Sequence, residues 1–225
     1  MPRAPRLTQT LAAALLTSGL AAGLSLSGCR PKHEASANRL VIASKNRIDT
    51  VDPGGAYTFG AMQLLSAIGD TLYSINTAGQ LEPRLAVGLP KLSADGLKAQ
   101  VQLRQGVRFH DGTPFNAAAM VFTLERFLAI GKLSYLLGDR VSGVRAVGPY
   151  TLELTLNRPF SALAELLSAV NLTPLSPSAY RNHRKSFLND RFVGTGPYRL
   201  SFFTNQQQRL EPFAGYWGAR AANGG

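Results

Sequence analysis

The sequence predicts an α/β fold of the mixed α+β kind, in which hairpins and helices follow one another along the chain. Residues 97–104 alternate between apolar and polar side chains, which is typical of a strand with one buried face. Residues 121–128 repeat apolar side chains every three or four positions, which indicates a helix. A second alternating strand at 151–156 follows a turn at Gly148-Pro149. We therefore expect helices packed on a mixed sheet that contains hairpins.

The amino terminus has the pattern of an export signal. Arg3 and Arg6 give a basic start, and residues 11–26 form an apolar run that is too short and too rich in Ala, Ser and Gly to predict a membrane span. Residues 1–28 are therefore predicted to be a signal peptide. The rest of the chain is long and apolar enough for one or two domains with a core, since 45% of the 225 residues are hydrophobic.

The signal ends in Leu26-Ser27-Gly28-Cys29, which resembles the lipobox of bacterial lipoproteins. The resemblance implies that Cys29 carries a lipid and that residues 29–38 form a polar tether. Two alternatives stay open, namely a buried thiol at Cys29 or cleavage by a standard signal peptidase in the Ala-rich run. The sequence has a single cysteine, so an intramolecular disulfide is impossible.

The formal net charge of +11 favours acidic surfaces in general, including lipid headgroups and nucleic acid. The densest basic group is Arg181, Arg184 and Lys185, and the other basic residues are scattered over many elements. No nucleic-acid-binding motif accompanies them. The pattern thus predicts a solvated face and no nucleic-acid partner.

The first elements of the exported chain are predicted by hydrophobic runs. Residues 40–43 form a short apolar run that predicts a first strand, followed by a turn at Val51-Asp52-Pro53. Residues 60–73 are predicted to form a helix. Its apolar side chains are spaced by three and four residues and are Met62, Leu65, Ile68 and Leu72.

Two Asp-Gly pairs organise the middle of the chain. Asp95-Gly96 predicts the turn of a hairpin before the strand at 97–104, because both residues tolerate the positive φ of a tight reversal. Asp111-Gly112 is predicted to close a short strand at 107–110. Asn116 is then the predicted N-cap of the following helix.

Proline positions and hydrophobic patterns predict the remaining elements. Pro159 suits the first turn of a helix, and the prolines of residues 171–177 predict an extended loop. Residues 178–188 predict a short helix with the basic group outside. Residues 198–203 predict a strand that pairs with residues 209–213.

Six sequence blocks occur in the order found in one known family. They are DTVDP at 49–53, the hairpin and helix region at 81–126, GPYTLELTLNRPF at 148–160, SPSAY at 176–180, VGTGPYRL at 193–200 and YWG at 216–218. Together they resemble the extracellular solute-binding proteins of family 5, which serve peptide and nickel ABC importers.

The resemblance implies a fold like that of type II periplasmic binding proteins, of which this chain has the first lobe. Residues 39–74 and 171–225 would form one discontinuous and incomplete subdomain, and residues 75–170 a second subdomain. The sequence stops where the second lobe of the family would follow. We therefore expect that lobe to be missing, the chain to be truncated, and solute binding to be weakened.

The implied function is that of a lipid-anchored, monomeric protein at the periplasmic or extracytoplasmic face of the cell membrane. It would bind peptides and deliver them to an ABC permease. Relatives bind peptides, nickel complexes, haem, glutathione or sugars, so the solute stays open. An envelope interaction protein that keeps the fold without transport is the alternative.

The resemblance also implies which side chains meet the solute. The loop after the Asp-Pro turn reaches into the cleft in this family, and Tyr135 falls where relatives place an aromatic residue. Asn171 and Thr173 lie on the predicted return to the first subdomain. Ordinary core or loop packing is the alternative for each predicted ligand-binding residue, and the full set is Tyr57, Thr58, Phe59, Met62, Tyr135, Asn171 and Thr173.

Enzymatic patterns are scarce. The histidines His33, His110 and His183 lack metal-ligand spacing, and His110 and Asp111 would point to opposite faces of a strand. Gly194-Thr195-Gly196 lacks the third glycine and the lysine of a phosphate-binding loop. We predict no catalytic residue, metal or cofactor, and a hydrolase is the remaining alternative.

Overall fold

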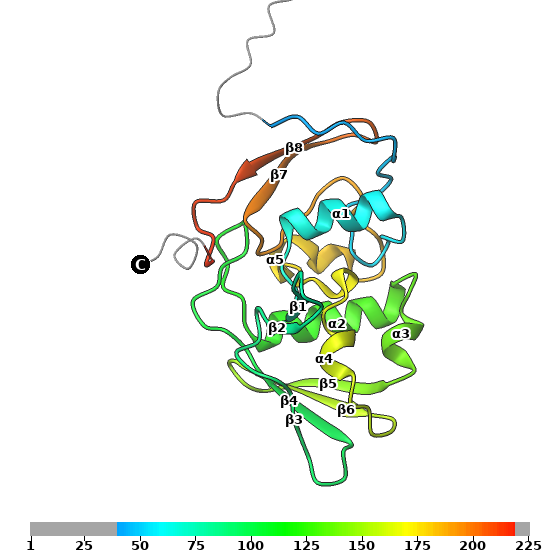
Figure 1. Cartoon of the computed structure of the whole chain (residues 1–225), viewed down its shortest axis with the longest axis vertical. Coiled ribbons are helices and arrows are strands. Elements are labelled where there is room, and N and C mark those ends of the chain that lie inside the picture. The colour runs from blue at the N-terminus through cyan, green and yellow to red at the C-terminus, as the bar shows by residue number, and fades with distance from the viewer. Residues whose placement is uncertain (1–39, 219–225) are drawn as a thin grey trace, which may run out of the picture. The chain divides into compact units, whose positions relative to one another are not determined.

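The computed structural model describes residues 40–218, of which residues 44–218 belong to one compact unit. Helices and strands alternate through this unit (Figure 1). In chain order they are α1 (Phe59–Ile68), β1 (Tyr73–Ile75), β2 (Leu81–Pro83), β3 (Lys91–Leu92), β4 (Lys98–Gln102), α2 (Ala117–Ile130), α3 (Tyr135–Gly138), β5 (Val141–Gly148), β6 (Thr151–Leu156), α4 (Leu163–Leu166), η1 (Val170–Leu172), α5 (Pro177–Tyr180), η2 (Arg181–His183), β7 (Tyr198–Phe203) and β8 (Gln208–Pro212).

The two hairpins predicted from alternation join in one four-stranded sheet of order β3-β4-β6-β5. Strands β4 and β6 pair so that Val101 lies opposite Leu152 and Ala99 opposite Leu154, which places the apolar faces of both hairpins on one side. Gly96 has φ of +69°, as the predicted hairpin turn requires. The mixed α/β fold class is confirmed.

The prediction of a mixed sheet is wrong for the described residues. They form three separate sheets, the four-stranded one and the pairs β1-β2 and β7-β8, and every pairing is antiparallel. Successive hairpins pair antiparallel neighbours, whereas a parallel pair needs a long crossover connection.

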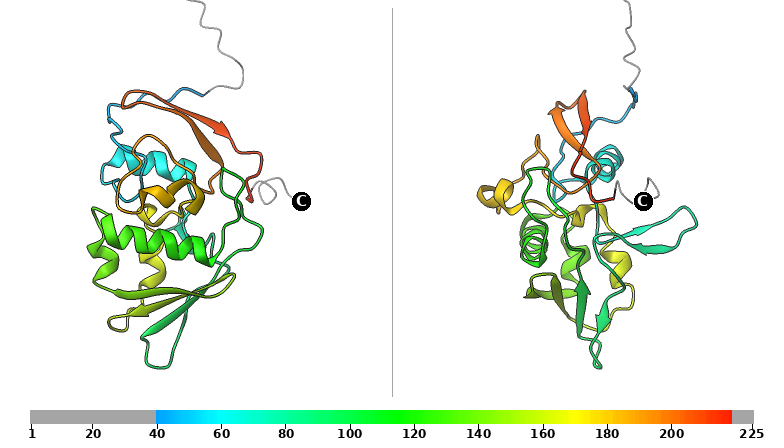
Figure 2. Two further views of the ribbon diagram at one scale, coloured as in Figure 1. Left: turned by 180° about the vertical axis from the view of Figure 1, so that it is seen from behind. Right: turned by 90° about the vertical axis from the view of Figure 1, so that its left-hand side faces the viewer.

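Helix α2 lies between the four-stranded sheet and α1, as two views of the ribbon agree (Figures 1 and 2). Its Met120, Leu124 and Phe127 are buried with Leu152 and Leu154 in the larger of two hydrophobic clusters. The predicted cap is confirmed, because Asn116 Oδ1 accepts a hydrogen bond from the Ala119 amide at 2.9 Å. This N-cap sets where the helix begins above the sheet.

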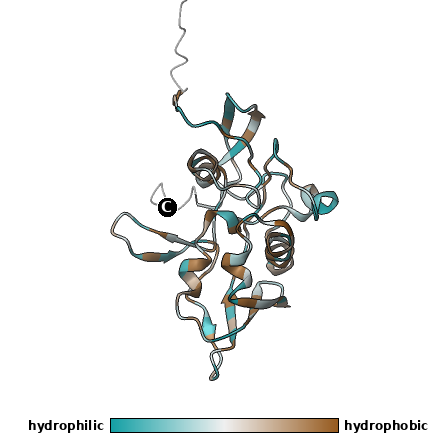
Figure 3. Ribbon diagram, turned by 90° about the vertical axis from the view of Figure 1, so that its right-hand side faces the viewer, coloured by the Kyte–Doolittle hydropathy of each residue, from teal (hydrophilic) through white to brown (hydrophobic). Residues whose placement is uncertain are grey.

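The second hydrophobic cluster lies on the other side of α2. Phe122 of α2 is buried there with Leu65 and Ile68 of α1 and with Tyr180 and Phe192 of the later chain. The ribbons of α1 and α2 carry the brown of hydrophobic residues (Figure 3). Two buried faces on one helix explain why α2 is apolar on more sides than a surface helix.

Two predicted strands are wrong. Residues 40–43 form no strand, and their Leu40, Val41 and Ile42 side chains are exposed, because no described strand pairs with them. The predicted strand at 107–110 is reduced to a single bridge between Arg108 and Pro114, because the turn at Gly112 reverses the chain at once.

Three predicted helices are shorter than expected. Helix α1 ends at Ile68, where the backbone of Gly69 becomes extended. A Cβ at Gly69 would lie 2.3 Å from Thr173 Cγ2, so this position requires glycine. The helix expected from Pro159 begins only at Leu163. The helix expected over 178–188 is divided between the short elements α5 and η2. The predicted division into subdomains 39–74 with 171–225 and 75–170 stays a prediction.

Candidate functional site

Internal hydrogen bonds hold the loop before α1 in place. Asp52 accepts backbone hydrogen bonds at its carbonyl oxygen from Gly55 and Ala56, each at 3.0 Å. The buried Asn171 side chain donates from Nδ2 to the carbonyl oxygens of Pro53 and Ala56, at 2.9 and 2.6 Å. The loop therefore leaves the protein interior in one defined conformation, directly before Tyr57.

The residues after this loop divide into exposed and structural ones. Tyr57 is 54% exposed and Phe59 is 72% exposed, although both are large and aromatic. Thr58 caps α1, since its Oγ1 accepts from the Ala61 amide at 3.4 Å, and Met62 is half-buried. The exposed aromatic rings are the groups that a ligand could reach.

A turn far along the sequence contacts this loop through Lys132. Lys132 donates its backbone N–H to the Gly54 carbonyl oxygen at 2.8 Å, and its ammonium nitrogen lies 4.2 Å from the centre of the Tyr57 ring. Tyr135, three positions later, begins α3 and is 57% exposed. We call the three exposed aromatic residues Tyr57, Phe59 and Tyr135, together with Lys132 that contacts Tyr57, the aromatic rim.

Lys132 was missed by the sequence reasoning. The end of α2 at Gly131 is foreseeable, but no local signal places the next residue against Tyr57. Only the backbone bond between Lys132 and Gly54 does so.

Asn171 and Thr173 lie beneath the surface rather than on it. Their relative exposures are 6% and 0%, and Thr173 Oγ1 donates to the Val170 carbonyl oxygen at 2.7 Å. Both side chains hold the backbone in place. Their predicted contact with a solute stays a prediction, as does that of the other proposed ligand residues.

A buried ion pair supports the loop from below. Arg126 of α2 binds Asp52 through two bonds, Nη1 to Oδ1 at 2.9 Å and Nη2 to Oδ2 at 2.6 Å. Their side chains are 2% and 0% exposed. Asp52 also accepts from the amides of Gly54 and Leu188, so its carboxylate is satisfied on both oxygens.

A second polar cluster docks the carboxyl-terminal end of the described chain. Asp70 accepts from Trp217 Nε1 at 2.9 Å and from the Tyr216 hydroxyl at 3.2 Å, and it pairs with Arg84 Nη2 at 2.9 Å. Burial and the adjacent Asp70 raise the pKa of Tyr216. All these groups satisfy one another, so the cluster is structural.

His110 and Asp111 make different contacts. His110 Nε2 donates to the Gly196 carbonyl oxygen at 3.0 Å, whereas Asp111 accepts from the hydroxyls of Ser176 and Ser178 at 2.6 Å. Burial opposes ionisation of Asp111, but the hydrogen bonds that Ser176, Ser178 and Thr113 donate outweigh it and lower the pKa of Asp111. The two side chains do not form an acid–base pair.

The His110 ring lies between Phe192 and Phe213, with centroid distances of 6.2 and 5.0 Å. Burial lowers the pKa of His110, although the bond to Gly196 and the charge of Asp70 act in the opposite direction. Its Nδ1 is buried without a hydrogen-bond partner in the described chain. Protonation would thus add a buried N–H with no acceptor.

This geometry predicts a pH-dependent stability. Above the ordinary pKa of 6.5 both folded and unfolded chains hold neutral His110; below it the unfolded chain gains a proton first, so the free energy of unfolding falls. We expect a loss of up to about 1 kcal/mol per pH unit, reduced by the partial exposure of the ring. Urea unfolding across the pH range measures it.

The variant His110→Gln should lose this part of the pH dependence, while His183→Gln, whose ring lies at the surface beside Ser186, keeps it. Equal pH profiles for wild type and His110→Gln would contradict the assignment.

Two hollows in the described residues lie away from the aromatic rim. One of about 530 Å³ is lined by Arg47, Asp49, Asn189, Asp190 and residues 203–206. Another of about 360 Å³ lies between residues 81–92 and 160–165. No residue of the aromatic rim lines either of these two hollows.

Two further features of the described residues concern metal ligands and membrane-spanning helices. Between residues 40 and 218, no three His, Cys, Asp or Glu side chains gather as metal ligands would. None of the helices in that range combines the length and hydrophobicity needed to cross a bilayer. Cys29 and the predicted tether at 29–38 lie outside the described residues.

Comparison with known families gives a match over most of the chain. The sequence profile described as "Bacterial extracellular solute-binding proteins, family 5 Middle" matches residues 80–224. Among curated proteins, the glutathione-binding protein GsiB of Escherichia coli O1:K1 / APEC is 33% identical over 186 residues, which are 81% of this chain and 36% of GsiB. The chain thus spans little more than a third of that relative.

Solved structures agree with the fold. The substrate-binding domain of an oligopeptide ABC transporter from Bacillus anthracis str. Ames superposes with a TM-score of 0.71 at 22% identity, over 80% of this chain and 38% of the other. An ABC transporter substrate-binding protein from Sinorhizobium meliloti gives 0.67 at 29% identity, over 76% and 35%. Both comparisons confirm the predicted fold class and are consistent with a partial lobe.

Proposed function

The chain belongs to the bacterial extracellular solute-binding proteins of family 5, and from this membership we propose that it is the solute-binding component of an ABC importer. It binds short peptides outside the cytoplasmic membrane and delivers them to the permease. It acts as a monomer, held at the membrane by a lipid on Cys29 and the tether at 29–38. It binds its solute without hydrolysing it.

The observation that carries this proposal is the aromatic rim. Large aromatic side chains normally lose exposure on folding, yet Tyr57, Phe59 and Tyr135 stay more than half exposed on a backbone held by buried hydrogen bonds. Rigid aromatic groups contribute contact area to a ligand at little cost in conformational entropy. Such a surface suits a ligand with apolar parts.

Lys132 would favour a ligand that carries a negative charge. Its side chain is exposed and, within residues 40–218, makes no ion pair, while its ammonium lies over the Tyr57 ring. A ligand carboxylate placed beside it would be favoured. Short peptides carry carboxylates, and one relative is named as a glutathione-binding protein, so glutathione is the first solute to test.

Calorimetric titration tests the proposal, using this chain and any longer gene product that contains it. We expect binding of glutathione or another short peptide, and a loss of about tenfold in affinity in Tyr57→Ala, because an aromatic contact contributes about 1–2 kcal/mol. Tyr198→Ala is the matched control, since Tyr198 is 43% exposed on β7.

Failure of the longer product to bind any short peptide would contradict the proposed function. Equal losses of affinity in Tyr57→Ala and Tyr198→Ala would instead show that the aromatic rim is not the surface that binds the peptide.

A further inference from the structure

A basic surface lies on the segment after α5. Arg181, Arg184, Lys185 and Arg191 are all exposed, and none of them makes an ion pair among residues 40–218. Asp190 is the one acidic residue between positions 181 and 191. We call these four residues the basic surface, and its net charge is positive even after Asp190 is counted.

The backbone of the basic surface is held by buried groups. Arg126 donates from Nε to the His183 carbonyl oxygen at 2.8 Å and from Nη2 to the Ser186 carbonyl oxygen at 2.7 Å. The buried Tyr180 hydroxyl donates to the Arg191 carbonyl oxygen at 3.1 Å. The segment is thus anchored at both ends, and ligand binding need not order its main chain.

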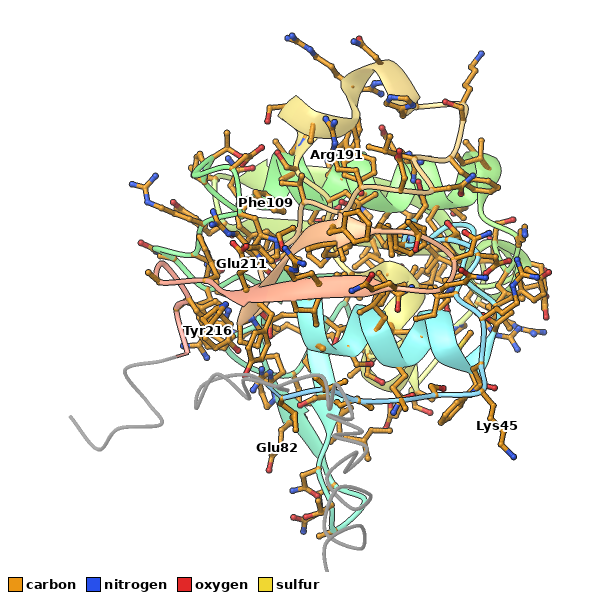
Figure 4. The ribbon with its side chains drawn as sticks, turned by 90° about the horizontal axis from the view of Figure 1, so that it is seen from above. Lys45, Glu82, Phe109, Arg191, Glu211 and Tyr216 are labelled. Carbon is orange, nitrogen blue, oxygen red and sulfur yellow. The ribbon has the colours of Figure 1, made fainter. Side chains whose placement is uncertain are left out.

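Most long side chains of the segment point outward, whereas the guanidinium of Arg184 lies over the Phe122 ring of α2. In a side view, α5 and η2 project beyond α2 (Figure 2), and from above their long side chains extend outward, with Arg191 at the foot of the same segment (Figure 4). Only Arg184 has a close aromatic neighbour, the Phe122 ring at 4.8 Å. A projecting, convex cationic segment fits an extended surface better than a small molecule.

We propose that the basic surface binds the anionic headgroups of the membrane to which the chain is tethered. Several exposed lysine and arginine side chains on one rigid segment are attracted to an anionic bilayer, and each raises the partition coefficient about fivefold. The choice of a membrane over nucleic acid rests on the extracytoplasmic location in the proposed function. The sequence also contains no nucleic-acid-binding motif.

Vesicle flotation tests this inference with residues 30–225, which contain all of the described compact unit from residue 44 onward and lack the predicted signal and lipid site. The probes are vesicles of phosphatidylglycerol with phosphatidylcholine, and vesicles of phosphatidylcholine alone. We expect binding to the first kind only, weakening as salt is added. The triple variant Arg181→Gln, Arg184→Gln, Lys185→Gln should bind about 100-fold more weakly.

The matched control is Lys45→Gln, Lys91→Gln, Lys98→Gln, which removes the same charge from exposed positions elsewhere. It should bind nearly as well as the wild type. Absence of binding to phosphatidylglycerol vesicles, an equal loss in both triple variants, or tighter binding to a DNA duplex than to the vesicles would overturn the inference. Solute binding is measured separately, so its failure would leave this result intact.

Discussion

Replacement of Arg126 by methionine is expected to lower the free energy of unfolding by about 3–5 kcal/mol, because it leaves a buried carboxylate without its partner. Asp52 would keep only amide donors, and the carbonyl oxygens of His183 and Ser186 would lose the hydrogen bonds that Arg126 donates. One side chain thus ties α2 to the loop before α1 and to the segment that carries the basic surface.

Urea unfolding followed by circular dichroism measures this effect. Arg199→Met is the control, because the Arg199–Glu211 pair is about half exposed on both sides, and exposed pairs contribute little. The double variant Asp52→Asn, Arg126→Met should be less destabilised than the sum of the single variants, because it removes the unpaired charge. Similar losses in Arg126→Met and Arg199→Met would contradict the role given to the buried pair.

The variant Gly196→Ala is expected to destabilise the fold by about 3 kcal/mol, at the upper end of the cost of overpacking. A Cβ at this position would lie 2.4 Å from the Ile68 carbonyl carbon and 2.5 Å from the Gly69 nitrogen, and both are backbone atoms at the end of α1. A side chain could rotate away from the added methyl group, but the backbone would have to move. That movement would also break the Gly196 bonds to Ile68 and His110.

Thermal unfolding of Gly196→Ala beside Gly88→Ala checks the cause. Gly88 has no neighbouring atom within 4 Å of the added position, so its variant should unfold near the wild-type temperature. A Gly196→Ala protein as stable as the Gly88→Ala protein would show that the 194–197 segment is not packed against α1 as described.

Local patterns predicted the elements whose stabilising contacts are local. The hairpin turn at Asp95-Gly96 and the cap at Asn116 depend on neighbouring residues, and both form as expected. Residues 40–43 had the composition of a strand, but strand formation needs a partner, and composition does not supply one. Helix α1 ends at an extended Gly69, which packs so closely against Thr173, a residue distant in sequence, that no side chain fits there.

In the candidate site, too, the sequence predicted local features but not contacts between distant residues. Family resemblance predicted that the loop after the Asp-Pro turn contacts the solute, and the structure leaves Tyr57 and Phe59 of this loop exposed. Their contact with a solute stays a prediction. The contact of Lys132 with Tyr57 and the pairing of Asp52 with Arg126 join residues far apart in sequence. A single sequence carries no periodic signal for such pairs, so the contacts that hold the site in place could not be predicted.

The most direct test of the central claim is an NMR titration of the tyrosine ring signals with glutathione and short peptides, in the longest gene product that contains this chain. The account predicts that Tyr57 and Tyr135 shift on binding, while Tyr198 on β7 and the buried Tyr180 do not. Saturable binding that shifts Tyr198 or Tyr180 but leaves Tyr57 and Tyr135 unchanged would contradict it.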